Sequence, residues 1–474
     1  MISKWVTIEL AGVDIGDKRL NNRIMHLLTA TYMQPEKSIN RLFHTRAEIQ
    51  ACYRFFSNDL VDENKIIAPH LQKTIGRANE HPVVLSLSDT TSLNYTSRHT
   101  LKDSGYISSN NAQGFFLHTS IAVTPDRLHL GIVGQKFWAR EKEKPKRVHR
   151  EYRAFPDKES YRWLEAYRDS CRLAESCKDT KVIHVTDREG DIFEIFTEHE
   201  LKTQRGSAAD YIIRSNHNRT VYPENKPSAS LYEELEESAV LAEIGFDIIN
   251  REDSSKRHIR QTIQALSVIT KSRYGADEPR TTVRINAIYL KEINPPAGEK
   301  PVNWCLVTSL PIDNIEEVKA IVQYYLCRWE IEVFFKTFKS GCKVEEKSLR
   351  SAARLFPLFS LYLILAWRIN YLLHMSRVAP EISCDVFFES SEWKVAYIAA
   401  TRKKIPPMSP PTMEVMLSYI AKLGGYLGRK KDPFPGVKVV WSGMSKLSQY
   451  VDAWELFGPE SRADDANFVK KTYA

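Results

Sequence analysis

Hydrophobic residues recur along this chain of 474 residues with two different spacings, one typical of strands and one typical of helices. Residues 83–90, 114–124, 128–138 and 181–187 form short runs that are rich in β-branched and aromatic side chains and bounded by turn residues, which predicts four strands. Residues 160–177 have the apolar spacing of an amphipathic helix. Strands with a helix before the last of them predict a mixed α/β core.

The segments around this core have other patterns. Residues 1–70 indicate a small helical domain with basic side chains on its surface. Within a core of residues 71–370, strand signals recur from about 205 to 312 with little helix between them, which predicts an inserted antiparallel β sub-domain. Residues 371–474 combine helical stretches with basic clusters and predict a helical C-terminal domain.

The most apolar segment, residues 355–373, is nearly long enough to span a membrane. Pro357, Arg368 and Asn370 interrupt it, and the sequence has no second segment of this kind. We therefore predict a buried core helix and no membrane partner.

Composition narrows the possible functions. Apolar residues make up 43% and charged residues 27% of the chain, which is the balance of a soluble globular protein. The net charge of +8 suits a polyanionic partner. The 7 cysteines include no C-x-x-C pair and the 13 histidines no i, i+4 pair. A disulfide scaffold, a zinc ribbon and a helical zinc site are therefore not expected.

Two aspartates stand at the ends of predicted strands. Asp89 closes the first strand and Asp187 closes the fourth. A single aspartate at the end of a strand is commonly a turn or N-cap residue. Two aspartates on adjacent strands would instead offer the carboxylate oxygens that Mg²⁺ prefers, at the edge of the sheet where ligands bind.

A single long helix predicted at residues 314–340 provides a third carboxylate. Four of its polar side chains fall within an arc of about 60°: Tyr325, Arg328, Glu332 and Lys339. Glu330 points about 160° away from Glu332, so we take Glu332 as the candidate active residue. The alternative is that Arg328 and Glu332 form an ordinary i, i+4 ion pair on a solvated helix face.

These motifs resemble those of a known family. The spacing Y-x2-R-x3-E-x6-K of the four helix residues resembles the signature of bacterial cut-and-paste transposases of the insertion-sequence-four family. SDTTSLNY (residues 88–95) and TDREGDI (residues 186–192) resemble the two aspartate motifs of that family. The likeness extends over nearly the whole chain, from GDKRLNNR (residues 16–23) to KLGGY (residues 422–426).

The resemblance implies an RNase-H-like catalytic core in which Asp89, Asp187 and Glu332 form a DDE triad. The triad is expected to hold two Mg²⁺ ions, with Mn²⁺ as a substitute. A member of this family cuts the ends of its transposon in double-stranded DNA through a hairpin intermediate and joins the 3′-OH ends to target DNA. We accordingly expect a homodimer in a synaptic complex, with the C-terminal domain supporting dimerisation, located in the bacterial cytoplasm and at the nucleoid when bound to DNA.

The resemblance also suggests which residues contact DNA. Trp304 is the candidate surface for a flipped base, although a tryptophan in this strand could simply belong to the core of the sheet. The other candidates are basic or phenolic and would bind phosphates or, in the N-terminal domain, read guanine edges: Tyr325, Arg328, Lys339, Arg214, Arg188, Arg19, Arg23 and Arg54. The three N-terminal arginines are also compatible with ordinary surface positions.

Two other functions remain open at this stage. A structure-selective nuclease on the same RNase-H-like core would share the three carboxylates but would not need the tyrosine, arginine and lysine beside Glu332. A non-catalytic DNA-binding protein, such as a transposition inhibitor, would need neither Asp89 nor Asp187. The intact acidic residues and the basic N-terminal domain argue against a non-catalytic protein. The tyrosine, arginine and lysine beside Glu332 and the β insertion argue against a nuclease.

Overall fold

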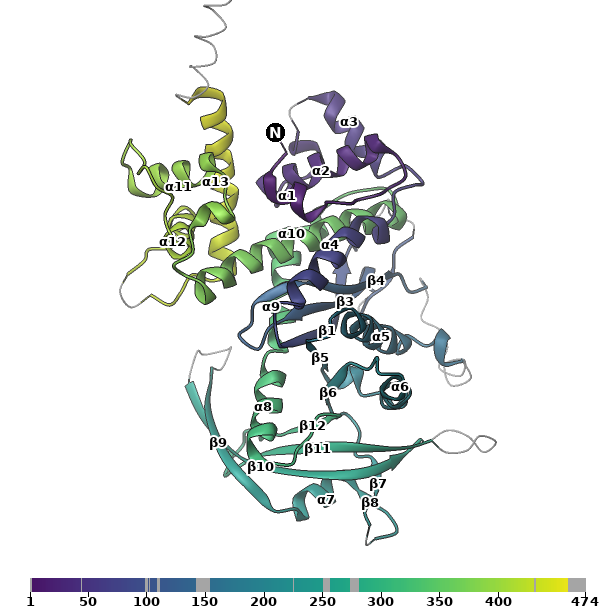
Figure 1. Cartoon of the computed structure of the whole chain (residues 1–474). Helices are drawn as coiled ribbons and strands as arrows, with labels where there is room; N and C mark the ends of the chain where they lie inside the picture. Colours follow the sequence, from purple (N-terminus) through teal and green to yellow (C-terminus); the bar gives the residue numbers. More distant parts are fainter. Residues whose placement is uncertain are drawn as a thin grey trace, which may run out of the picture.

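We describe the chain from a computed structural model (Figure 1). The structure describes residues 2–458 except for residue 44, residues 99–100, 102, 109–110, 142–153, 225, 250–255, 273–280 and 430–431. The expected C-terminal domain therefore includes residues 459–474, which lie outside the described part of the chain.

Four helices precede the first strand: α1 (Lys4–Glu9), α2 (Lys18–Met33), α3 (Arg46–Phe55) and α4 (Glu63–Ala78). Side-chain caps mark where three of them begin, because the first N–H groups of a helix have no partner within it. Asp17 caps α2, Thr45 forms a capping box with Glu48 at α3, and Asp62 caps α4.

The central layer is one mixed sheet of 12 strands among the described residues. Its first half contains β1 (Val83–Asn94), β2 (Gly105–Tyr106), β3 (Gln113–Val123), β4 (His129–Trp138), β5 (Lys181–Thr186) and β6 (Asp210–Arg214). The second half contains β7 (Thr220–Tyr222), β8 (Ala229–Ser230), β9 (Val240–Ile249), β10 (Lys256–Lys271), β11 (Thr282–Glu292) and β12 (Trp304–Thr308). Neighbours follow the order β2-β3-β1-β5-β6-β12-β11-β10-β7-β8, with β4 on β3 and β9 on β10.

The antiparallel half continues the sheet of the core. β1, β5 and β6 pair in parallel, and β12 pairs antiparallel with β6, so the hydrogen-bonded ladder runs from the core into the extension. A short helix, α7 (Leu231–Glu237), lies in this extension. The predicted fold class is confirmed: an α/β, RNase-H-like core with an antiparallel β insertion and helical flanks.

The sheet separates two hydrophobic cores, because successive strand residues point to opposite faces. Val84 belongs to the core beneath α5 (Tyr161–Ser176) and α6 (Phe193–Gln204), whereas Leu85 and Leu87 belong to the larger core on the other face. The larger core includes side chains of the N-terminal helices, of the helices that follow β12 and of the C-terminal helices. Each face of the central strands is thus covered by helices.

The helix expected at residues 314–340 is broken, so that prediction was wrong. The chain forms α8 (Ile315–Leu326), α9 (Trp329–Lys336) and a π-helical turn, η5 (Thr337–Gly341). Between α8 and α9 the N–H groups of Cys327 and Arg328 donate to carbonyls three residues back, at 3.1 and 3.0 Å. This tighter turn separates the two helices, and a wheel drawn for one regular helix does not hold across it.

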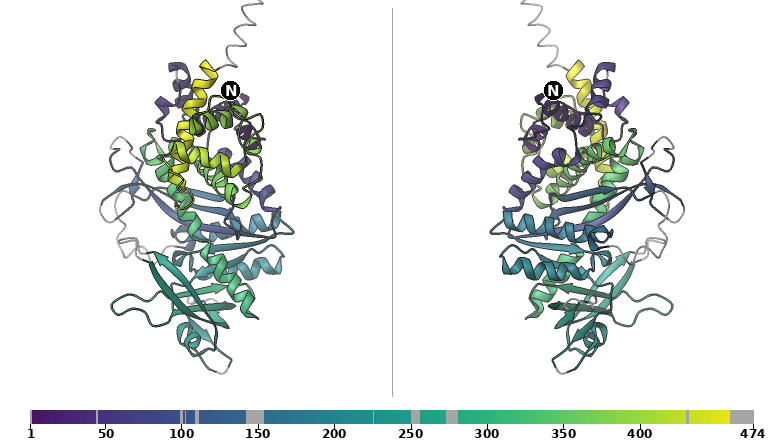
Figure 2. Two further views of the ribbon diagram at one scale, coloured as in Figure 1. Left: turned by 90° about the vertical axis from the view of Figure 1, so that its left-hand side faces the viewer. Right: turned by 90° about the vertical axis from the view of Figure 1, so that its right-hand side faces the viewer.

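The predicted core helix is α10 (Ala352–Val378), which is long and apolar enough to pass for a membrane span. Of its most apolar window, 78% is buried inside the protein, which fits the core helix of a soluble protein. Three further helices follow: α11 (Ser390–Thr401), α12 (Met413–Leu423) and α13 (Val437–Phe457). Figures 1 and 2 show α10 crossing beneath both the N-terminal and the C-terminal helices at one end of the molecule, with the β extension at the other end. The expected domain limits at residues 70 and 370 fall inside α4 and α10.

Candidate active site

Strand register places the two predicted aspartates side by side. The parallel pairing of β1 with β5 ends at Ser88 opposite Thr186, so Asp89 and Asp187 occupy the next position on each strand. Adjacent strands lie about 4.8 Å apart, which brings the two backbones to this spacing. The sequence suggested that Asp89 closes its strand, but β1 continues to Asn94. Residues 89–94 remain paired with β3 after the parallel pairing with β5 has ended.

The two aspartates interact electrostatically. Burial, and next the negative charge of Asp187, raise the pKa of Asp89 to about 7. The backbone N–H of Thr90 donates to Asp89 Oδ1 at 2.6 Å, and the N–H of Glu189 donates to Asp187 Oδ1 at 2.9 Å. Both carboxylates are therefore held by the backbone, and the charge of Arg328 offsets part of the rise in the pKa of Asp89.

The third carboxylate approaches from α9. Arg328 Nη2 donates to Glu332 Oε1 at 2.8 Å, and Arg328 Nη1 lies 3.6 Å from Asp89 Oδ2. The guanidinium of Arg328 thus connects the helix to β1. The geometry is more than a surface i, i+4 pair, since the side chain of Arg328 is only 16% exposed and has acidic neighbours from two elements.

Lys339 reaches the same strand from the π-helical turn. Its Nζ donates to the backbone carbonyl of Ser92 at 2.7 Å and lies 3.6 Å from Glu345 Oε1. The i→i+5 bond from Cys342 to Thr337 widens the turn that carries Lys339. Lys339 therefore lies close to the part of β1 that follows Asp89.

An aromatic pair lies beside these groups. The rings of Trp304 and Tyr325 meet edge to face with centroids 5.9 Å apart, and Trp304 also stacks on Phe246 of β9 at 5.9 Å. Tyr325 is buried, and burial raises the pKa of its phenol. Arg214, at the end of β6, interacts electrostatically with Tyr325, and its Nη2 donates to the Asn303 carbonyl at 3.5 Å.

The remaining predicted residues lie apart from this cluster or at its rim. Arg188 follows Asp187 in a 3-10 turn and is exposed. Arg19 and Arg54 are exposed on α2 and α3, and Arg23 is partly buried on α2. These two helices lie at the far end of the molecule from the β extension (Figure 1), and the structure does not bring their arginines to the acidic residues.

The sequence matches three protein-family models. Residues 61–367, more than half of the chain, match the family described as a transposase DDE domain. The chain belongs to the DDE transposase family. Residues 2–61 match the transposase DNA-binding family, and residues 364–458 match the Tn5 transposase dimerisation domain. The resemblance to the insertion-sequence-four transposases is thereby confirmed, and the protein is a DNA-binding, DNA-cleaving or DNA-transferring enzyme with a dimerisation domain.

The donor set of the transposase fits a hard divalent cation. DDE transposases use divalent metal, and Asp89, Asp187 and Glu332 offer only oxygen ligands. Burial raises the pKa of Asp89 most and the negative charge of Asp187 raises it further, while Arg328 brings one positive charge close to Asp89 and Glu332. A cation would complete this neutralisation.

Sequence reasoning missed a residue that links the two aspartate segments. Arg162 of α5 donates through Nε to Thr90 Oγ1 at 3.0 Å and through Nη2 to Glu189 Oε2 at 2.8 Å. Thr90 follows Asp89 directly, and Glu189 belongs to the turn after Asp187. An arginine on an amphipathic helix carries no signal of this role, because only the packing of α5 on the sheet brings it there.

Proposed function

We propose that the transposase binds the inverted repeats at its transposon ends, cleaves them by Mg²⁺-dependent hydrolysis through a hairpin intermediate, and joins the 3′-OH ends to target DNA. The observation that supports this best is the convergence of Asp89 beside Asp187, with Glu332 connected to Asp89 through Arg328. Two Mg²⁺ ions held by these carboxylates would supply an activated attacking oxygen and a stabilised leaving oxygen.

Side chains around the acidic cluster would bind the phosphates of the DNA strand that is cut. Arg328, Lys339 and Arg214 are positive charges around the acidic cluster, and each can donate charge-assisted hydrogen bonds to phosphate oxygens. The phenol of Tyr325 lies between Arg214 and Arg328 and can add a neutral donor, because its raised pKa keeps the proton on the oxygen. Arg188, which is exposed next to Asp187, would contact the DNA strand at the rim of the site.

Hairpin formation bends the DNA sharply, so one base has to leave the stack. Trp304 lines a cavity of about 310 Å³ together with apolar groups of β9, β10 and α8. Phe246, stacked on Trp304, lines the same cavity. We infer that a flipped base stacks on this aromatic surface, which is only partly buried by the protein itself.

The flanking domains would assemble the complex. Arg19, Arg23 and Arg54 of residues 1–70 are proposed to contact the transposon end, and residues 371–474 to hold a homodimer. In such a synaptic dimer each protomer contacts two ends and then target DNA, at the nucleoid. Because Lys and Arg contacts to phosphate release counterions, end binding should weaken steeply as salt increases.

Linear DNA carrying the inverted repeats tests this proposal. Incubation with Mg²⁺ should give hairpin-ended products, and simple nicks alone would favour a structure-selective nuclease. Glu332→Ala should keep end binding and lose cleavage, whereas Glu316→Ala, which changes an exposed glutamate of α8, should retain both. Cleavage that survives in Glu332→Ala would refute the proposed triad. End binding without cleavage in the unchanged protein would identify a non-catalytic inhibitor.

A further inference from the structure

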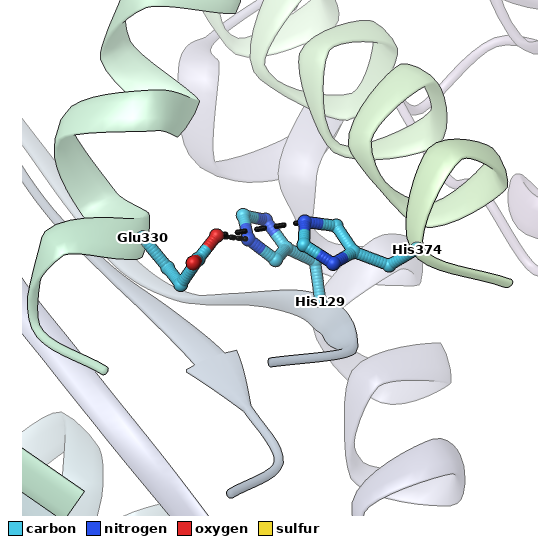
Figure 3. A group of neighbouring side chains, drawn as sticks. All are labelled: His129, Glu330 and His374. Carbon is cyan, nitrogen blue, oxygen red and sulfur yellow. Dashed lines mark hydrogen bonds and ion pairs between the residues drawn. The ribbon is translucent and has the colours of Figure 1, made fainter. Parts of the chain in front are cut away.

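A second group of metal-ligand side chains consists of His129, Glu330 and His374 (Figure 3), and Glu330 points about 160° away from Glu332 on α9. His129 begins β4, Glu330 lies in the first turn of α9, and His374 lies near the end of α10. Their side chains are 1%, 7% and 6% exposed. Among the residues that the structure describes, these three form the group whose ligand atoms all lie within 4.8 Å of one another.

The contacts of this group have the dimensions of a coordination sphere. His129 Nε2 lies 3.2 Å and His374 Nε2 lies 3.5 Å from the same oxygen, Glu330 Oε2. Bonds of about 2.0–2.1 Å to a tetrahedral ion place neighbouring ligand atoms roughly 3.4 Å apart. Two of the three separations are close to this spacing and all three lie within 4.8 Å, so an ion could sit between these atoms once the side chains adjust to it.

We propose that His129, Glu330 and His374 bind one transition-metal ion of the zinc class. Two imidazole nitrogens and one carboxylate suit Zn²⁺, whereas Mg²⁺ prefers oxygen ligands alone. Each neutral imidazole would bind through Nε2 and keep its proton on Nδ1. The site goes beyond the proposed function, since it shares no residue with the acidic triad and differs from it in metal preference.

The surroundings hold two of the ligands in place. Trp367 Nε1 donates to the backbone carbonyl of His129 at 2.9 Å, which ties the start of β4 to α10. The His129 and His374 rings lie nearly parallel, with centroids 4.7 Å apart and planes 17° apart.

Two positive charges near Glu330 oppose an ion. Arg127 Nη1 lies 3.8 Å from Glu330 Oε1, the oxygen that the histidines do not share, and its side chain is 53% exposed. Arg377 also interacts electrostatically with Glu330 and Arg127. Because Arg127→Gln removes a positive charge beside Glu330, it should strengthen metal binding several-fold.

The ion would brace the helix that carries Glu332. It would connect α9 to β4 and α10 by coordinate bonds, two residues away from Glu332 and on the opposite face. The zinc-class ion would thus have a structural role, while the cations of the catalytic reaction bind at the acidic triad.

Metal content and Co²⁺ absorption test the site without measuring activity. The full chain, stripped with a chelator, is titrated with Zn²⁺ and separately with Co²⁺ in excess Mg²⁺, which saturates oxygen sites. We expect one ion per chain and the visible absorption of four-coordinate Co²⁺. Glu330→Gln and His374→Asn should each weaken Zn²⁺ binding by at least about 100-fold, more than the loss of a ligand's hydrogen-bond partner costs.

Two further variants separate this site from the triad. Asp89→Asn should retain the ion, and Arg127→Gln should bind it more tightly, a gain that a misfolded variant would not show. The proposal is overturned if Zn²⁺ stays substoichiometric and Co²⁺ gives no visible spectrum, or if the ion is lost in Asp89→Asn but kept in Glu330→Gln. It is also overturned if Arg127→Gln leaves the affinity unchanged.

Discussion

The cost of crowding carboxylates in the active site can be measured as folding stability. In the metal-free protein, burial and Asp187 raise the pKa of Asp89 from the ordinary 3.8 to about 7. The folded protein therefore holds a proton on Asp89 in a pH range where the unfolded chain has released it. As the pH rises from about 4 to about 7, the charged form becomes dominant and stability is lost, so the cost is full above pH 7.

Asp89→Asn removes this cost. At about 1.4 kcal/mol per pKa unit, the shift of the Asp89 pKa corresponds to about 4 kcal/mol. The attraction of Arg328 is already included in this shift. The Asp89 side chain is 19% exposed, so solvent screens part of the effect. We expect the variant to gain about 2–4 kcal/mol near pH 8 and roughly half of that near pH 5.5.

Urea or thermal unfolding in the presence of a chelator measures the gain. Asp59→Asn, at an exposed loop position between α3 and α4, is the matched control and should change little. Added Mg²⁺ should stabilise the unchanged protein and affect Asp89→Asn much less, because a ligand stabilises only the state that binds it. If Asp89→Asn is no more stable than the unchanged protein near pH 8 without metal, burial and the charge of Asp187 do not impose the assumed cost on ionised Asp89.

Three further predictions concern other parts of the molecule. Trp304→Ala should impair hairpin formation more than the first nick on labelled end DNA; equal loss at both steps would exclude a role in receiving the flipped base. Burial raises the pKa of Glu392 in α11 from 4.5 to about 7, so stability falls as the pH rises through this range. Glu392→Gln should therefore raise the unfolding midpoint near pH 8 by much more than near pH 5, and a gain independent of pH would contradict this. Lys347 is fully buried and donates to the carbonyls of Pro35 and Lys37 at 2.9 and 2.6 Å. Lys347→Met should therefore lower the free energy of unfolding in urea by about 2–4 kcal/mol. An unchanged unfolding midpoint would argue against these hydrogen bonds.

The sequence was sufficient for the fold class, and it supplied the three acidic residues proposed for the active site. Alternating apolar residues predicted the strands that carry Asp89 and Asp187, and local periodicity separates Glu332 from Glu330 by about 160° within one helix. That local separation agrees with the structure, in which Glu332 contacts Arg328 and Glu330 contacts two histidines. These features depend on neighbouring residues in the chain, which is why a pattern can predict them.

Only the tertiary structure decided the arrangement of distant segments. Asp89 lies inside β1 because pairing with β3 extends the strand, and the helix breaks at Cys327 and Arg328, whose N–H groups donate to carbonyls three residues back. The group of His129, Glu330 and His374 comes from three elements separated by up to 245 positions in the sequence, so no helical i, i+4 spacing could reveal it. Contacts of this kind arise from packing across the sheet, and one chain's local pattern carries no information about them.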